Sequence, residues 1–166
     1  MIGVIGFGRF GELAVRYLSR RFPVRVLERG GKGAAIRLAG GTPAPLEGVC
    51  RQSVLILAVP ISAMRGTLAE IAPRLSPGTL VVDVCSVKVL PVAWMQAALP
   101  AGVRILATHP MFGPDSAARR LEGQKIVLCP VRISPGRLRR IRELLEAEGL
   151  QVIEATPDEH DRQIAT

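Results

Sequence analysis

The sequence has 166 residues, of which 48% are hydrophobic and 22% are charged. These proportions are those of a globular protein, and they exclude a disordered or collagen-like chain. A chain of this length corresponds to one ordinary domain that buries about 70% of its unfolded surface, so it needs no disulfide or metal to hold it together. Since aromatic residues make up only 4%, the core is expected to consist of Val, Leu, Ile and Ala.

The net charge is +8 and the isoelectric point is about 10.6, which raises the question of a nucleic-acid partner. The arginines are scattered, however, and their one dense run, at residues 132–142, lies mostly on a predicted helix where glutamates follow at pairing distance. No aromatic residues alternate with this run, so it offers no stacking surface for a single strand. We therefore expect no nucleic-acid partner; salt-dependent retention of DNA would support the opposite view.

The three cysteines, Cys50, Cys85 and Cys129, lie in or beside apolar segments. This placement indicates buried, reduced thiols in a cytoplasmic protein. The two histidines are far apart and no paired-cysteine spacing occurs, so no metal site is expected. Pro, Asp or Gln interrupts each apolar stretch well before the length of a membrane span, and no signal peptide precedes the first strand, so no membrane partner is expected.

Short apolar runs alternate with helical patterns along the chain. In chain order, the strands are predicted at residues 2–5, 24–27, 54–59, 79–84, 103–108, 125–129 and 151–155. Helices are predicted at residues 9–20, 62–75 (with Ser62 as the cap), 87–99 and 137–148. A glycine-rich connection begins at residue 30, and the stretch to residue 46 holds at most a short helix and a loop. This alternation predicts an α/β fold with a doubly wound, mostly parallel sheet of the Rossmann type.

The first predicted strand leads directly into a glycine-rich turn that opens an amphipathic helix. The turn reads Gly6-Phe7-Gly8-Arg9-Phe10-Gly11. In this setting the pattern predicts a dinucleotide-binding loop, and we expect these six residues to contact the cofactor. The first glycine permits the tight turn, the second lets the backbone approach a pyrophosphate, and the third lets helix and strand pack closely. The N–H groups of the first helical turn then face the phosphates.

Glu28 ends the second predicted strand, 22 residues after Gly6. At that position a carboxylate accepts hydrogen bonds from the ribose diol of an adenosine and repels a 2′-phosphate, which favours NAD over NADP. Arg29, the next residue of the expected cofactor site, and Lys32 leave NADP possible, because both would pair with such a phosphate if Glu28 turned away.

Further site residues are expected where later strands end, because ligands bind beyond the carboxyl ends of parallel strands. One predicted strand ends at Val59 and Pro60, and another leads into Ser86; all three are expected to contact the cofactor. His109 follows the strand at residues 103–108, in a loop shaped by glycine and proline. A histidine beside a nicotinamide can take the proton of a hydroxyl as hydride leaves the substrate, so His109 is expected to be catalytic.

Two segments give the chain a family resemblance. They read Asp83-Val84-Cys85-Ser86-Val87-Lys88 and His109-Pro110-Met111-Phe112-Gly113-Pro114-Asp115-Ser116. Both resemble signatures of the prephenate and arogenate dehydrogenases of tyrosine biosynthesis, and the resemblance covers essentially the whole chain. It implies NAD(P)-dependent oxidative decarboxylation of prephenate to 4-hydroxyphenylpyruvate, or of arogenate to tyrosine. It also implies that His109 takes the proton of the ring hydroxyl, and that Ser86 is catalytic by helping to orient this histidine and the nicotinamide.

Two other residues are given supporting roles. His160 matches a position of the family near its domain junction, and we interpret it as mainly structural, through hydrogen bonds to neighbouring acids at a helix start. Asp83 is interpreted as a residue that organises its loop rather than one that reacts.

The segment Thr156-Pro157-Asp158-Glu159 has the form of a helix start. We therefore expect a dinucleotide-binding domain at residues 1–155 and, at residues 156–166, the start of a helix toward an absent second domain. The resemblance implies that this second domain is all-helical, forms a homodimer and supplies cationic residues for the substrate carboxylates. The alternative is a stand-alone NAD(P)-binding or redox-sensing module without catalysis, and the choice between prephenate and arogenate stays open.

Overall fold

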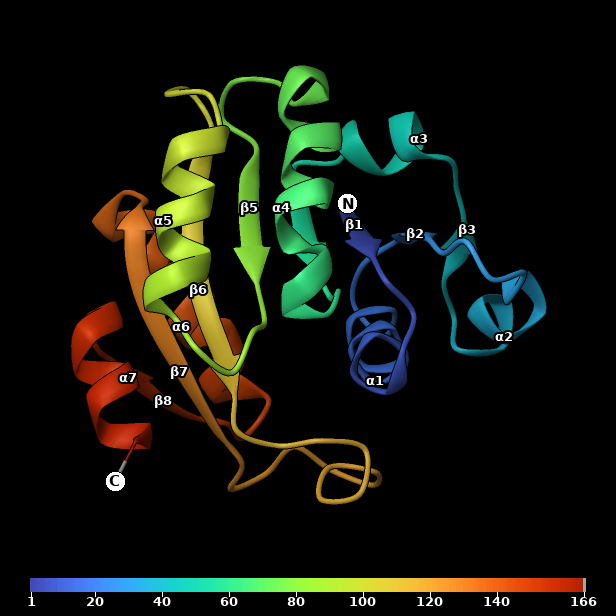
Figure 1. Cartoon of the computed structure of the whole chain (residues 1–166). Coiled ribbons are helices and arrows are strands. Elements are labelled where there is room, and N and C mark those ends of the chain that lie inside the picture. Colours follow the sequence, from blue (N-terminus) through green and yellow to red (C-terminus); the bar gives the residue numbers. More distant parts are fainter. Residues whose placement is uncertain (166) are drawn as a thin grey trace.

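A computed structural model gives the structure of the protein and describes residues 1–165. Within these residues, eight strands form one sheet in the order β3-β2-β1-β4-β5-β6-β7-β8. Neighbouring strands are parallel except β6 and β7, which run antiparallel. Helices cover both faces of the sheet (Figure 1), so the predicted doubly wound, mostly parallel α/β fold is confirmed.

The strands are β1 (Ile2–Ile5), β2 (Val24–Leu27), β3 (Thr42–Pro43), β4 (Val54–Leu57), β5 (Leu80–Asp83), β6 (Arg104–Pro110), β7 (Lys125–Arg132) and β8 (Gln151–Glu154). The α-helices are α1 (Arg9–Leu18), α2 (Gly33–Leu38), α3 (Leu46–Cys50), α4 (Ile61–Ile71), α5 (Val89–Ala98), α6 (Pro135–Ala147) and α7 (Pro157–Ile164), and a 3₁₀ turn at Ala72–Arg74 follows α4.

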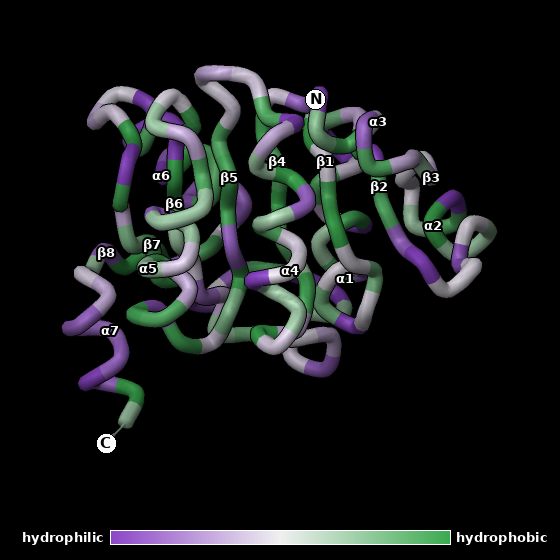
Figure 2. Tube along the Cα trace, turned by 45° about the horizontal axis from the view of Figure 1, so that its top comes forward, coloured by the Kyte–Doolittle hydropathy of each residue, from purple (hydrophilic) through white to green (hydrophobic). Residues whose placement is uncertain are grey.

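Side chains of each central strand alternate between two apolar layers. On β4, Leu55 and Leu57 pack with α3, α4 and α5, whereas Val54 and Ile56 pack on the opposite face, the side of α1, α2 and α6. Because both faces are covered, the central strands are continuous apolar runs rather than alternating ones. Figure 2 shows these hydrophobic strands in the middle of the molecule and a largely hydrophilic α7 at its edge.

The structure corrects the prediction for the start of α4. Pro60 is the N-cap residue, with extended backbone, and the helix begins at Ile61. Ser62 therefore lies inside the first turn and does not cap the helix. Residues 30–50 also hold more structure than predicted: α2, the two-residue strand β3 and α3.

The strand that carries His109 is longer than predicted. β6 continues to Pro110 because the antiparallel strand β7 keeps pairing with it beyond the end of β5, through His109 with Val127 and Pro110 with Ile126. His109 thus lies on a strand and not in a loop. Its position is set by backbone pairing, which holds a residue more firmly than a loop does.

The carboxyl ends of β1, β4 and β5 stand level with one another, and β6 continues three residues beyond them. Ile5 on β1 pairs with Leu57 on β4, Leu57 pairs with Asp83 on β5, and Asp83 pairs with Ala107 on β6. The order of the strands reverses between β1 and β4, and such a switch point at the carboxyl edge is where open α/β sheets bind ligands.

A buried ion pair holds β5, the loop before α5, and β6 together at this edge. Asp83 and Lys88 have no exposed side-chain surface, and the Lys88 ammonium donates to Asp83 Oδ2 and to the Thr108 carbonyl. The Asp83 carboxylate also accepts from the backbone N–H of Thr108 and of Cys85. The prediction that Asp83 organises its loop thus agrees with the contacts, which join β5, the loop before α5, and β6.

The predicted burial of the three cysteines is confirmed. Cys50, Cys85 and Cys129 are buried and free, and burial raises the pKa of both Cys85 and Cys129 to about 11. In the part of the chain that the structure describes, no helix combines the length and the apolar character needed to cross a bilayer.

Replacing Lys88 by methionine is expected to lower the free energy of unfolding by about 3–5 kcal/mol, because it leaves the Asp83 carboxylate buried without its cation. Urea unfolding followed by circular dichroism measures the change. Arg120→Met is the control, since it removes an exposed ion pair with Glu122 and should cost less than about 1 kcal/mol. Equal, small losses in the two variants would contradict this role of the buried pair.

Candidate functional site

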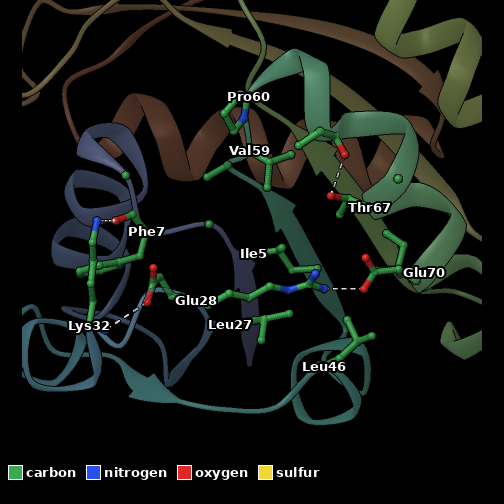
Figure 3. Close-up of a pocket in the computed structure, with 17 residues that line it drawn as sticks. Ile5, Phe7, Leu27, Glu28, Lys32, Leu46, Val59, Pro60, Thr67 and Glu70 are labelled. Carbon is green, nitrogen blue, oxygen red and sulfur yellow. Dashed lines mark hydrogen bonds and ion pairs between the residues drawn. The ribbon is translucent and has the colours of Figure 1, made fainter.

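A cavity of about 480 Å³ opens at the carboxyl ends of β1, β2 and β4 (Figure 3). It contains seven of the residues predicted to contact the cofactor: Gly6, Phe7, Gly8, Glu28, Arg29, Val59 and Pro60. These residues lie on separate segments of the sequence, and the sheet brings them together around one cavity. Leu46, Thr67 and Glu70 also line the cavity and were not predicted, because no local pattern marks the inward faces of α3 and α4.

The three glycines of the loop have different structural roles. Gly6 has a positive φ of 101°, and a Cβ atom there would lie 2.2 Å from the Ala58 carbonyl oxygen. A Cβ atom on Gly11 would lie 2.4 Å from the carbonyl oxygen of Gly6. At Gly8, by contrast, a Cβ atom would meet nothing within 4 Å. Gly6 and Gly11 therefore allow the close crossing of β1, β4 and α1, while Gly8 leaves open space beside the backbone.

Gly8 is also the N-cap of α1, and no side chain among residues 1–165 caps this helix. The N–H groups of its first turn are therefore left for water or for a bound anion, as in phosphate sites at helix starts. The open space at Gly8 and these uncapped donors fit the pyrophosphate of a dinucleotide.

Glu28 is held beside the cavity by the backbone. Its two carboxylate oxygens accept from the N–H of Gly30 at 2.7 Å and of Lys32 at 3.1 Å. Both nearby cations bind elsewhere: the Lys32 ammonium donates to the Phe7 carbonyl at 3.2 Å, and Arg29 pairs with Glu70 (Figure 3). Glu28 is thus not turned away, and the cations that would attract a 2′-phosphate already have protein partners.

The remaining residues of the predicted loop do not line the cavity. Arg9 is exposed and binds both carboxylate oxygens of Asp115 at 2.9 Å. Phe10 packs against Phe112, with ring centroids 6.2 Å apart. Together with the helix-packing role of Gly11, these contacts tie the start of α1 to the segment between β6 and β7.

Ser86 and His109 lie farther along the same edge and outside this cavity. Ser86 is exposed, three residues after the end of β5, and His109 is half-buried on β6. No hydrogen bond joins them in the described part of the chain. Instead, His109 Nδ1 lies 2.9 Å from Nε2 of His160 on α7, and the two rings meet edge to face.

His160 is 2% exposed, and its Nδ1 lies 2.7 Å from Asp161 Oδ1. The prediction of a hydrogen bond to a neighbouring acid is therefore confirmed, but the contact with His109 was missed. The two histidines are 51 residues apart in the sequence. Their contact depends on where α7 packs, so no sequence spacing predicts it.

Burial lowers the pKa of His109 to about 4, because the surroundings disfavour the charged ring. His160 and the Lys88 ammonium lower the pKa further, and Asp161 acts in the opposite direction. His109 is therefore neutral near pH 7. A neutral imidazole has one nitrogen with a free lone pair, which is the form that can accept a proton.

Comparisons with known proteins show the family to which the chain is similar. The sequence profile described as "Prephenate dehydrogenase, nucleotide-binding domain" matches residues 29–154. The chain is 32% identical over 119 residues to a probable arogenate/prephenate dehydrogenase of Methanocaldococcus jannaschii, an alignment that covers 70% of this chain and 26% of that protein.

Two crystal structures are similar to the whole chain. Synechocystis arogenate dehydrogenase superposes with a TM-score of 0.84 at 26% identity, over 99% of this chain and 62% of that one. Prephenate dehydrogenase from Aquifex aeolicus, in complex with hydroxyphenyl propionate and NAD+, superposes with a TM-score of 0.81 at 20% identity, over 100% of this chain and 64% of that one. The chain therefore spans less than two thirds of the length of each of these relatives.

The glycine loop yields a matched pair of variants. Gly11→Ala is expected to lower the free energy of unfolding by about 1–3 kcal/mol, because its methyl group overlaps the Gly6 carbonyl and the helix must shift. Gly8→Ala meets open space and should change stability by less than about 0.5 kcal/mol. Urea unfolding of the two variants measures both values, and a Gly8→Ala variant as unstable as Gly11→Ala would refute the division of roles.

Proposed function

The chain belongs to the prephenate dehydrogenase family, of which it contains the nucleotide-binding domain, and we propose that it is the cofactor-binding part of an NAD-dependent oxidoreductase. The proposed reaction is the oxidative decarboxylation of prephenate or arogenate. The observation that supports this proposal is the shared carboxyl edge: a cavity of about 480 Å³ beside the glycine loop over β1 and β4, and a neutral histidine on β6 farther along the same edge.

The preference for NAD rests on Glu28. Its carboxylate oxygens keep free lone pairs after accepting two backbone N–H groups, so they can also accept from ribose hydroxyls. A 2′-phosphate at this point meets like-charge repulsion, and Arg29 and Lys32 are already engaged. The Aquifex aeolicus structure contains NAD+, which supports the same choice.

The proposed chemistry assigns one reacting group to this chain. When bound, the dinucleotide supplies the acceptor for the hydride that leaves the carbinol carbon of the substrate. His109 takes the proton of the ring hydroxyl, and loss of carbon dioxide then leaves an aromatic ring. Ser86 is exposed beside this edge and is proposed to contact the nicotinamide. Because aromatisation drives the reaction, the protein has mainly to position the groups and to move this proton.

The substrate side of the site is proposed to be completed by a further, helical domain after α7. Large apolar side chains are exposed around the start of α5, after β6 and at the end of α7: Val87, Leu90, Met111 and Ile164. Exposed apolar groups at one edge are typical of a surface that other protein covers.

The first test is binding of the cofactor to the chain. We expect NAD(H) to bind with a dissociation constant below about 1 mM and NADP(H) to bind at least about tenfold more weakly. Titration by calorimetry or by NADH fluorescence measures both constants. Gly8→Ala should weaken binding without unfolding the protein, since it fills the space beside the backbone. Absence of NAD(H) binding at millimolar concentration would overturn the proposed function.

A matched pair of variants, Glu28→Gln and Glu122→Gln, tests the role of Glu28. Glu28→Gln should reduce the preference for NAD over NADP, because it removes the charge that repels the 2′-phosphate. Glu122→Gln removes a carboxylate that lies outside the cavity and should leave the preference unchanged.

The second test concerns turnover in the protein expressed from its whole reading frame. His109→Ala should lower kcat by about 10²–10⁴-fold, the usual effect of losing an acid–base group, while the affinity for NAD stays the same. An unchanged rate would remove His109 from the mechanism.

A further inference from the structure

Three groups form a continuous chain of contacts that the proposed reaction does not yet use. Asp161 Oδ1 lies 2.7 Å from His160 Nδ1, and His160 Nε2 lies 2.9 Å from His109 Nδ1. The last nitrogen of the chain, His109 Nε2, has no hydrogen-bond partner among residues 1–165 and is left for a ligand. Such a chain can decide which nitrogen of His109 carries its proton.

Asp161 is held as an ionised carboxylate. Its Oδ1 accepts from the Lys88 backbone N–H at 2.7 Å, and its Oδ2 accepts from that of Val89 at 2.9 Å. Burial acts to raise the pKa of Asp161, but the hydrogen bonds from Val89, His160 and Lys88 outweigh it and leave the pKa below its usual range. An ionised carboxylate only accepts hydrogen bonds, so the nitrogen that faces it must donate.

The same two hydrogen bonds dock the helix that carries His160. Lys88 is the N-cap residue of α5 and Val89 its first residue, so Asp161 satisfies donors at the start of that helix. At the other end, a capping box between Thr156 and Glu159 fixes where α7 begins. These contacts place His160 against a residue 51 positions earlier in the chain.

From this geometry we propose that His160 and Asp161 are positioning residues that fix the tautomer of His109. Asp161 requires His160 Nδ1 to donate, which makes Nε2 of a neutral His160 an acceptor. His109 Nδ1 must then donate to it, and His109 Nε2 keeps the free lone pair that faces the substrate. The proposal rests on the proposed function for its catalytic meaning, but the tautomer itself is a property of the ligand-free chain.

A doubly protonated His160 would give the opposite result. It would donate from both nitrogens, His109 Nδ1 would have to accept, and the proton of His109 would sit on Nε2. The base would then be blocked on the side of the substrate. The two arrangements differ in which nitrogen is bare, and that difference is directly measurable.

The experiment is a long-range ¹H–¹⁵N correlation spectrum of the chain labelled at histidine, recorded without ligand at neutral pH. The sequence contains only two histidines, and His160→Gln leaves His109 alone, which assigns the rings. We expect a protonated Nδ1 and a bare Nε2 on both rings of the wild-type protein. A proton on Nε2 of either ring would overturn the proposal, so the wild-type spectrum decides the question without a variant.

The variants separate positioning from packing. The carbonyl of a glutamine reaches about where Nε2 of His160 lies, so His160→Gln should keep the tautomer of His109. His160→Leu offers no acceptor and should move His109 toward the Nε2–H form, which free neutral histidine prefers. The control, Asp158→Asn, changes an exposed carboxylate on the same helix and should leave both rings as they are. A His109 tautomer that is the same in the leucine and glutamine variants would contradict the proposal.

Turnover gives the functional arm in the protein expressed from its whole reading frame. His160→Leu should lower kcat by about 10–100-fold, the range seen when a supporting hydrogen bond behind a functional group is lost, with KM for NAD unchanged. His160→Gln should restore most of the rate, and equal losses in both variants would contradict a positioning role. If NAD fails to bind at all, the proposed function falls while the spectra still decide the tautomer, so the two failures are distinguishable.

Discussion

Two oppositely charged side chains without solvent exposure, Asp83 and Lys88, form an ion pair where β5 ends, and the part of the site around His109 depends on this pair. Neither charge can be withdrawn from the pair without a large desolvation cost, so the segments that carry them are fixed. The ammonium also binds the carbonyl of Thr108, the residue before His109. The backbone N–H of the same lysine binds Asp161. One buried pair thus sets the position of β6, of the start of α5 and of α7.

This arrangement divides the carboxyl edge into two parts. At β1 and β4, backbone crossing at Gly6 and Gly11 leaves a cavity lined mostly by apolar groups, with Glu28 at its rim. At β6, a buried network holds His109 neutral and half-buried. The level ends of β1, β4 and β5, with β6 continuing beyond them, join both parts into a single edge. Extended ligands bind along such an edge, with one end on the glycine loop and the other near the polar groups of the later strands.

Sequence reasoning succeeded where neighbouring residues decide the structure. The glycine loop, the apolar strands and the cap at Thr156 are local patterns, and the structure confirms them. Sequence reasoning failed where segments that are distant in the chain contact one another. The extension of β6 to Pro110 needs β7 as an antiparallel partner. The contact of His109 with His160 depends on the docking of α7, and that docking rests on hydrogen bonds of Asp161 to backbone 72 and 73 residues away.

We propose that one dinucleotide lies along this edge with its nicotinamide beside His109. A crystal structure of the protein with bound NAD+ would show the position of each part of the dinucleotide. The predicted complex has the adenosine ribose at Glu28, the pyrophosphate at Gly8 and the nicotinamide next to Ser86 and His109. A dinucleotide that lies in the reverse direction, or whose nicotinamide stays away from His109, would contradict this arrangement.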